Sequence, residues 1–272
     1  MNHSNTMSIR EFSRLTGIKR ENLRFYDQIG LLSPEHRGEN NYRYYSRHQL
    51  NTAYLITGLR QLDVSLEEIK QYSQKRTPEK MLELFAQQEK RIQKEIDRLR
   101  EQRSIMNVQT TMIQDAMKHG RHALFLIERE REPIFLCPPL PAEIADDDGE
   151  IIAYEYAAEH GVNFGYPFAA VISQTALKQI KPVENPIIRY YFKAKKPHNG
   201  YKPAGLYVIA YAPLELWDTN IMHRQVLDYI KQNKLKICGD AYEECPLDEM
   251  TISDPDEYCI RMEIPVVKQI KF

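Results

Sequence analysis

The chain has 272 residues, of which 42% are hydrophobic and 28% charged, values that suit two or more globular domains with sizeable cores. No stretch approaches the ~20 apolar residues of a membrane span, and no signal peptide is evident, so we expect a cytoplasmic protein that does not enter the membrane. The net charge of −1 conceals +4 over residues 1–80 and −6 over residues 120–272. A basic head suits a polyanion, and an acidic remainder suits cationic ligands.

Two short helices are predicted near the N-terminus. Ser8 and Glu11 have the spacing of a capping box that starts the first helix, and Thr16-Gly17 ends it. A second helix should run over residues 18–28, where Gly30 stops it. Two short helices joined by a tight turn that contains glycine indicate a helix-turn-helix.

A wing and two further helices should follow. Residues 31–45 are rich in Pro, Gly, Asn, Arg and Tyr and predict a β-hairpin. Ser46 and Gln49 have capping-box spacing and should open a third helix to about residue 62, and Ser65 should open a fourth to about residue 73. We therefore predict a winged helix-turn-helix domain over residues 1–76.

Residues 77–119 predict one long helix. Thr77 suits the N-cap position and Pro78 the first helical position, and no further glycine or proline interrupts the segment before its end. Apolar residues recur every seven positions, at Phe85, Ile92, Leu99, Met106 and Ile113. Such a repeat favours a coiled coil and a homodimer over a helix packed on its own domain, because ~40 helical residues extend about 60 Å.

Residues 120–272 predict an α+β domain with a largely antiparallel sheet, so the whole chain is an α+β multidomain protein. Strands are expected at 123–127, 165–172, 186–192, 206–211, 240–244 and 258–267, with helices at 149–159 and 218–232. The cysteines Cys137, Cys238, Cys245 and Cys259 form no C-x-x-C motif, so we expect small buried side chains and neither a metal site nor a cofactor.

The segment Ile18–Pro34, followed by Asn41-Tyr42-Arg43-Tyr44-Tyr45, resembles the MerR family of regulators, and the resemblance extends over about residues 7–118. It implies a dimer held by an antiparallel coiled coil, which binds a near-palindromic operator in double-stranded promoter DNA and distorts it so that RNA polymerase can start transcription. Basic side chains and tyrosines of the second helix and the wing should contact DNA. The expected DNA-contacting residues are Lys19, Arg20, Arg24, Tyr26, Tyr42, Arg43 and Arg47, with His48 as a further candidate.

The C-terminal domain resembles GyrI-like effector-binding domains, as in the BmrR-type multidrug-responsive activators, in residues 237–244 and 256–266. The resemblance implies an aromatic pocket for hydrophobic, cationic inducers, with a strand glutamate at its floor; the matching position is Glu243, ranked above Glu244, with Tyr258 beside it. Aromatic faces attract cations, and a carboxylate adds complementary charge. The further candidates are Tyr154, Tyr156, Phe164, Tyr166, Phe168, Tyr207, Tyr211 and Trp217.

Three alternatives remain open at this stage. The aromatic residues could belong to an ordinary core. Glu243 and Tyr258 could serve as general base and proton donor of a small-molecule hydrolase, as the resemblance implies for some GyrI-like domains, although no Ser/His/Asp or metal cluster supports an enzyme. The C-terminal domain could also bind a protein partner, which would leave a DNA binder without a small-molecule inducer.

Overall fold

A computed structural model describes residues 6–39, 41–141, 146–178, 187–214 and 221–269 of the chain. Its contacts divide the chain into two compact units, Met1–Arg98 and Leu99–Phe272. Across the described ranges, no helix is both long enough and apolar enough to cross a membrane.

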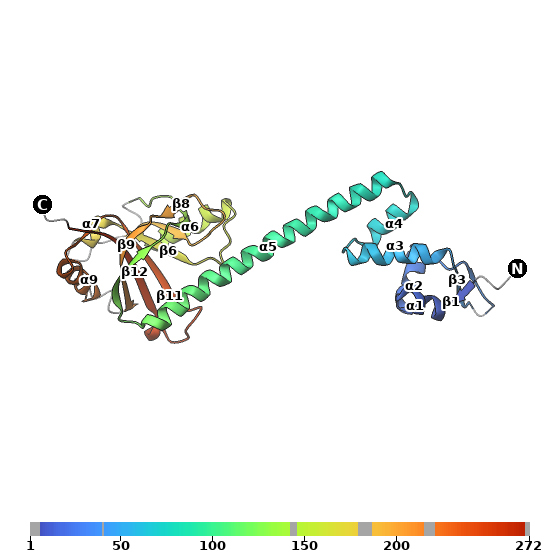
Figure 1. Cartoon of the computed structure of the whole chain (residues 1–272), viewed down its shortest axis with the longest axis horizontal. Coiled ribbons are helices and arrows are strands. Elements are labelled where there is room, and N and C mark those ends of the chain that lie inside the picture. Colours follow the sequence, from blue (N-terminus) through green and yellow to red (C-terminus); the bar gives the residue numbers. More distant parts are fainter. Residues whose placement is uncertain (1–5, 40, 142–145, 179–186, 215–220, 270–272) are drawn as a thin grey trace. The chain divides into compact units, whose positions relative to one another are not determined.

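The N-terminal unit combines short helices with a small antiparallel sheet (Figure 1). Its elements are β1 (Thr6–Ser8), α1 (Ile9–Thr16), α2 (Arg20–Gln28), β2 (His36–Arg37), β3 (Arg43–Ser46), α3 (Gln49–Gln61) and α4 (Leu66–Gln74). Strand β3 is central and pairs with both β1 and β2. The predicted helix-turn-helix and hairpin wing are confirmed, and β1 is an addition that three residues of sequence did not reveal.

The helix starts follow the predicted caps in three of four cases, at Ser8, Ser65 and Thr77, whose hydroxyl accepts from the Lys80 N–H at 3.3 Å. The side chains of Ser8 and Ser65 each accept a hydrogen bond from the backbone N–H three residues later, and both capping boxes are complete. The prediction at Ser46 was half right: the Gln49 side chain accepts from the Ser46 N–H at 3.0 Å, but α3 starts after His48 without a side-chain cap. The physical reason is that Ser46 still belongs to β3, where it pairs with Thr6.

Helix α5 (Pro78–His119) begins in the first unit and ends in the second. Its first turns pack on the helix-turn-helix core, where Leu84 is buried. Four of the five predicted heptad positions, Phe85, Ile92, Leu99 and Met106, remain exposed in the single chain, whereas Ile113 is partly buried against the C-terminal sheet. Leu82, Ile96 and Met117 form a second series at multiples of seven residues, and the seven exposed residues are between 37% and 74% accessible. We call these seven residues the heptad stripe. An exposed apolar stripe of this length requires a partner helix to remove it from water.

The C-terminal unit is built around one antiparallel sheet. Its elements are β4 (Leu124–Arg129), β5 (Glu132–Leu136), α6 (Asp146–Glu159), β6 (Phe168–Ile172), α7 (Gln174–Leu177), β7 (Ile187–Phe192), β8 (Gly200–Lys202), β9 (Gly205–Pro213), α9 (Ile221–Gln232), β10 (Leu235–Ile237), β11 (Ala241–Leu247), η2 (Pro255–Glu257) and β12 (Cys259–Lys268). The strand order is β4-β9-β12-β11-β6-β7-β5-β8, with β10 also paired to β12. The antiparallel α+β domain is confirmed. Strands β5, β8 and β10 were not predicted, because each is short and β5 contains a proline.

The two faces of this sheet are covered by different elements. Buried residues of α6 and α9, including Ala153 and Met222, join the main core with Val208 and Met262 of the sheet. On the opposite face, the last turns of α5 pack through Ala116 on the strand β9 (Figure 1). Because side chains alternate along a strand, consecutive residues of β11 and β12 point to opposite faces. We refer to these as the α6 face and the α5 face.

Candidate functional site

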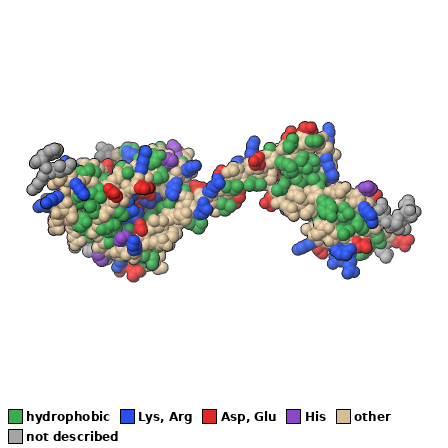
Figure 2. Space-filling model, viewed as in Figure 1, with side chains coloured by type: hydrophobic (Ala, Val, Ile, Leu, Met, Phe, Trp, Pro, Cys, Tyr) green, Lys and Arg blue, Asp and Glu red, His purple; other side chains and the backbone are tan. Residues whose placement is uncertain are grey.

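The helix-turn-helix presents a group of exposed basic side chains. Lys19, Arg20 and Arg24 are exposed around α2, while Leu23 on its other side is fully buried in the core. Figure 2 shows basic side chains gathered at the end of this unit where α1 and α2 lie. A helix with a buried apolar side and a free basic side has the form that the DNA major groove accepts.

The wing is anchored to α2 by one acidic residue. Asp27, with only 6% of its side chain exposed, accepts hydrogen bonds from Arg37 of β2 and Arg43 of β3, both at 2.7 Å. The carboxylate therefore ties both strands of the wing to the end of α2. Sequence reasoning assigned Arg43 to DNA and missed this role of Asp27, since no local signal indicates which of the wing arginines it meets.

The other predicted DNA-contacting residues differ in accessibility. Tyr42 and Arg47 are exposed at the wing and at the start of α3, as is His48. Tyr26 is only 7% exposed and belongs to the helix-turn-helix core, where burial raises the pKa of its hydroxyl. Tyr26 thus packs mainly within the core of the unit.

An aromatic cluster forms on the α6 face of the C-terminal sheet. The ring of Tyr154 stacks on Phe168 with centroids 4.6 Å apart and meets Phe164 edge-on at 5.4 Å. Phe192 and Tyr190 of β7 contact Phe168 at 5.1 and 4.8 Å. We call these five residues the aromatic cluster; Tyr190 and Phe192 were not among the predicted ligand residues, although they lie in a predicted strand.

The aromatic cluster reaches the surface next to acidic groups. Tyr154 is 38% and Phe164 is 53% exposed, which is unusual for stacked rings that only fill a core. Burial, and after it the charges of Glu150 and Glu249, raises the pKa of Tyr154. Partly exposed aromatic rings with carboxylates nearby form the environment in which a lipophilic cation is stabilised.

Glu243 and Glu244 point to opposite faces. Glu243 is partly exposed and pairs across the strands with Ala170 and Met262, both of which face the α6-side core. Phe168 is two residues from Ala170 along β6 and points to the same face, so Glu243 and Phe168 are diagonal neighbours on adjacent strands. Glu244 is 1% exposed and points to the α5 face.

Glu244 is the centre of a buried ionic network on the α5 face. Its Oε1 accepts hydrogen bonds from the Tyr191 hydroxyl at 2.7 Å and from Lys193 and Lys202, each at 2.8 Å, and its Oε2 accepts from Arg261. Burial alone would raise the pKa of Glu244, but the three cations outweigh it and hold the pKa well below its usual range.

Two further carboxylates complete this network. Glu263, also buried, forms an ion pair with Lys202 and another with Arg129 at 3.3 Å. Glu132 of β5 lies 2.9 Å from Lys193 and 3.5 Å from Lys202. We define the ionic network as Glu132, Lys193, Lys202, Glu244, Arg261, Glu263 and Arg129. Sequence reasoning found none of these lysines and arginines, because they come from β4, β8 and β12 and from the residue that follows β7.

The remaining predicted ligand residues lie apart from the aromatic cluster. Tyr166 is buried in the core, and Tyr156 contacts Phe135 and His160. Tyr207 and Tyr211 are buried on the α5 face, and Trp217 lies outside the described residues. Tyr258 precedes β12 and is four residues from Met262, the partner of Glu243, a separation of about 13 Å along a strand.

The cysteines show no metal-binding arrangement. Within the part of the chain that the structure describes, no group of three His, Cys, Asp or Glu side chains could hold a metal ion. All four cysteines are free; Cys137 and Cys259 are buried and Cys245 partly so. Cys238 was expected to be buried but is exposed, because it lies in the turn between β10 and β11.

Comparison with known proteins identifies a matching family and several sequence relatives of this chain. The model of the MerR HTH family regulatory protein matches residues 7–76. The multidrug-efflux transporter 2 regulator of Bacillus subtilis is 31% identical over 255 residues, 89% of this chain and 89% of that protein. The HTH-type transcriptional regulator CueR of Escherichia coli is 39% identical over 62 residues, 23% of this chain and 46% of its own.

Among solved structures, EcmrR in its DNA complex aligns with 97% of this chain and 100% of its own at 19% identity, with a TM-score of 0.39. The identification depends on the sequence relatives, one of which matches across both units at above 30% identity. The chain belongs to the MerR family of helix-turn-helix regulatory proteins, and it is a transcription regulator that binds DNA.

Proposed function

We propose that this regulator binds a near-palindromic promoter operator as a homodimer, in the cytoplasm, and activates transcription by RNA polymerase when a hydrophobic, cationic small molecule binds its C-terminal unit. The observation that carries the ligand class is the aromatic cluster, which is accessible at Tyr154 and Phe164 and lies beside carboxylates. The Bacillus subtilis relative, a regulator of a multidrug-efflux transporter by name, supports the same class.

Dimerisation is proposed through the heptad stripe of α5. Its seven exposed apolar residues are spaced for a coiled coil, and a second copy of the helix would bury them. Two helix-turn-helix units held in this way match the two half-sites of a palindromic operator. Lys19, Arg20, Arg24, Tyr42 and Arg47 are proposed to contact DNA because all five are exposed.

Glu243, the diagonal neighbour of Phe168 across the strands, is proposed as the carboxylate that complements the cation. The ligand is proposed to bind without being chemically changed: the sequence relatives are regulators, and Tyr258 does not pair with Glu243 in the sheet. Recovery of the intact ligand after long incubation with the protein tests this part of the proposal.

The test is direct binding by calorimetry with the full-length protein. Tetraphenylphosphonium should bind more tightly than triphenylphosphine oxide, a neutral molecule of similar shape. Tyr154→Ala and Glu243→Gln should each weaken binding of the cation and reduce induction of transcription, while operator binding stays unchanged. Tyr201→Ala removes another exposed tyrosine, distant in sequence from the cluster, and should have no effect. Equal binding of the cation and the neutral compound would contradict the proposal.

A further inference from the structure

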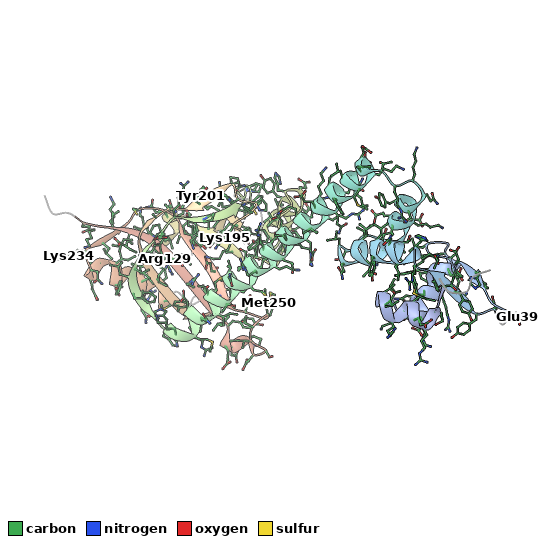
Figure 3. The ribbon with its side chains drawn as sticks, turned by 45° about the vertical axis from the view of Figure 1, so that its right-hand side comes forward. Glu39, Arg129, Lys195, Tyr201, Lys234 and Met250 are labelled. Atoms are coloured by element: carbon green, nitrogen blue, oxygen red, sulfur yellow. The ribbon has the colours of Figure 1, made fainter. Side chains whose placement is uncertain are left out.

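A cavity lies on the α5 face of the C-terminal unit, on the other side of the sheet from the aromatic cluster. It has a volume of about 430 Å³, within the range of small-molecule sites. One wall is the α5 helix, through residues that include Val108 and Met112, and the other walls are strands of the sheet. Figure 3 labels Arg129 and Lys195, which line this cavity from the sheet side.

The lining of this cavity is basic. Six cationic side chains line it, namely Arg129, Arg131, Lys193, Lys195, Lys202 and Arg261, against the four acidic side chains of Asp115, Glu130, Glu132 and Glu263. Glu244 does not line the cavity but pairs with Lys193, Lys202 and Arg261, so six cations face five carboxylates in all. One excess cation remains here, although residues 120–272 together carry a net charge of −6. Figure 2 shows blue and red side chains gathered on one face of this unit. Concentrated positive charge at a low-dielectric cavity attracts anions.

The two lysines at the cavity are almost completely buried. The side chains of Lys193 and Lys202 are 5% and 4% exposed, yet both contribute to the lining. The most exposed of their partners is Glu132, whose side chain is 38% exposed. Water therefore weakens the ion pairs that Glu132 makes with the two lysines. Each ammonium group has three donor hydrogens. Lys202 contacts three carboxylates, whereas Lys193 contacts only Glu132 and Glu244, so one donor of Lys193 remains for a carboxylate or phosphate that enters the cavity.

Arginine donors also exceed their acceptors here. The Nε atoms of Arg129 and Arg261 are buried and make no hydrogen bond, although that of Arg261 lies 3.4 Å from Glu263 Oε1 in an ion pair. Arg261 is 3% exposed, and its terminal nitrogens are engaged by Glu244 and by the Tyr211 hydroxyl. A buried cluster with unsatisfied donors is stabilised when further acceptors are supplied.

Part of the lining is apolar. Val108 and Met112 of α5, with Pro203 and Tyr207 on the sheet side, give the cavity a surface on which a ring or short alkyl chain can pack. We propose that this cavity binds an amphipathic organic anion, with its carboxylate or phosphate near Lys193, Lys202 and Lys195 and its apolar part against Met112 and Tyr207. The bound anion would contact α5, the helix that carries the heptad stripe.

The test uses four ligands that share one ring system and differ in their polar group. 2-Naphthoate and 2-naphthyl phosphate represent the two anions, 2-naphthylmethanol is the neutral control, and 2-naphthylmethylammonium is the cationic control. Binding to the full-length protein is measured by calorimetry at low and high salt. At least one anion should bind more than tenfold more tightly than the neutral and cationic compounds, and its affinity should fall with added salt. The anion that binds identifies the headgroup.

Two variants of opposite sign separate this site from a purely structural ionic network. Lys195→Gln removes an exposed cation of the rim and should weaken anion binding about two- to fivefold. Glu132→Gln removes the carboxylate that competes for Lys193 and Lys202, and should strengthen it. Lys196→Gln is the matched control, because Lys196 is exposed, adjacent and not in the lining.

The proposal is overturned if neither anion binds, or if the ammonium or alcohol binds as well as the anions. It is also overturned if Glu132→Gln weakens anion binding or leaves it unchanged. Loss of tetraphenylphosphonium binding in Tyr154→Ala has no bearing on these outcomes, since Tyr154 lies on the α6 face.

Discussion

Glu244 and Glu243 are adjacent in sequence, and their conversion to glutamine should have very different effects on stability. Glu244→Gln removes the charge that Lys193, Lys202 and Arg261 share at a site with no side-chain exposure. Breaking a buried ion pair from one side costs about 3–5 kcal/mol. The three cations would remain buried with only Glu132 and Glu263 to balance them. Glutamine keeps one acceptor oxygen, so we expect roughly 3 kcal/mol. Glu243→Gln, partly exposed on the other face, should cost less than about 1 kcal/mol.

The assay is amide hydrogen exchange in β11 and β12, because it reports opening of the C-terminal unit without requiring two-state unfolding of the whole chain. Removing Lys193 as well, in Glu244→Gln/Lys193→Met, should recover part of the loss, since one uncompensated cation disappears. Similar losses for Glu244→Gln and Glu243→Gln, or a loss below about 1 kcal/mol for Glu244→Gln, would refute the reasoning.

The pH dependence of Glu244→Gln follows from the direction of the pKa shift. The cations hold the pKa of Glu244 well below its ordinary value of 4.5, so its charged form is favoured in the folded state. The stability it contributes is fully present above pH 4.5 and is lost as pH falls toward the lowered pKa. The difference between the wild-type protein and Glu244→Gln should therefore shrink below about pH 4.5. A difference that grows in acid would show that another group dominates.

Three further changes test the other sites. Leu99→Asp places a charge in the heptad stripe, where burial of each leucine is worth about 1–2 kcal/mol. The variant should shift from dimer toward monomer in light-scattering measurements. A fully dimeric variant would contradict the coiled coil. Asp27→Ala leaves Arg37 and Arg43 without their shared carboxylate, and should weaken operator binding about tenfold with unchanged helix content; unchanged affinity would show that the wing needs no anchor. Glu68→Gln removes the partner of Arg91, whose hydrogen bonds lower the pKa of Glu68 to about 2. In thermal unfolding, the variant should lose less than about 1 kcal/mol of stability above pH 4.5, and this loss should vanish toward pH 2. A loss that persists at pH 2 would exclude this ion pair as its source.

Local sequence patterns were sufficient for the elements whose cause is local. The capping boxes at Ser8 and Ser65 depend on residues three positions apart, and both helices start where the pattern indicates. The long helix α5 has a proline at its first position, and Gly120 directly follows it. Its heptad repeat and the basic side of α2 are likewise periodic features of one segment. These patterns identified the helix-turn-helix, the long helix α5 and the regulator class.

The ligand sites depend instead on contacts between segments far apart in the chain. The aromatic cluster joins α6 to β6 and β7, and the partners Tyr190 and Phe192 were missed because nothing near them in sequence identifies Tyr154 as a neighbour. The wing anchor is similar, since Asp27 and Arg43 are 16 residues apart.

The sequence by itself determined the order of the domains in this chain: a basic helix-turn-helix domain, a long helix with a heptad repeat, and an acidic α+β domain. Only the tertiary structure decided what the two adjacent glutamates of β11 do. Side chains alternate across a sheet, so the register that pairs Glu243 with Met262 and Glu244 with Arg261 sends one to the α6 face and the other into the ionic network. Register is set by strands distant in sequence, which is why one motif could not distinguish an accessible carboxylate from one neutralised by three cations.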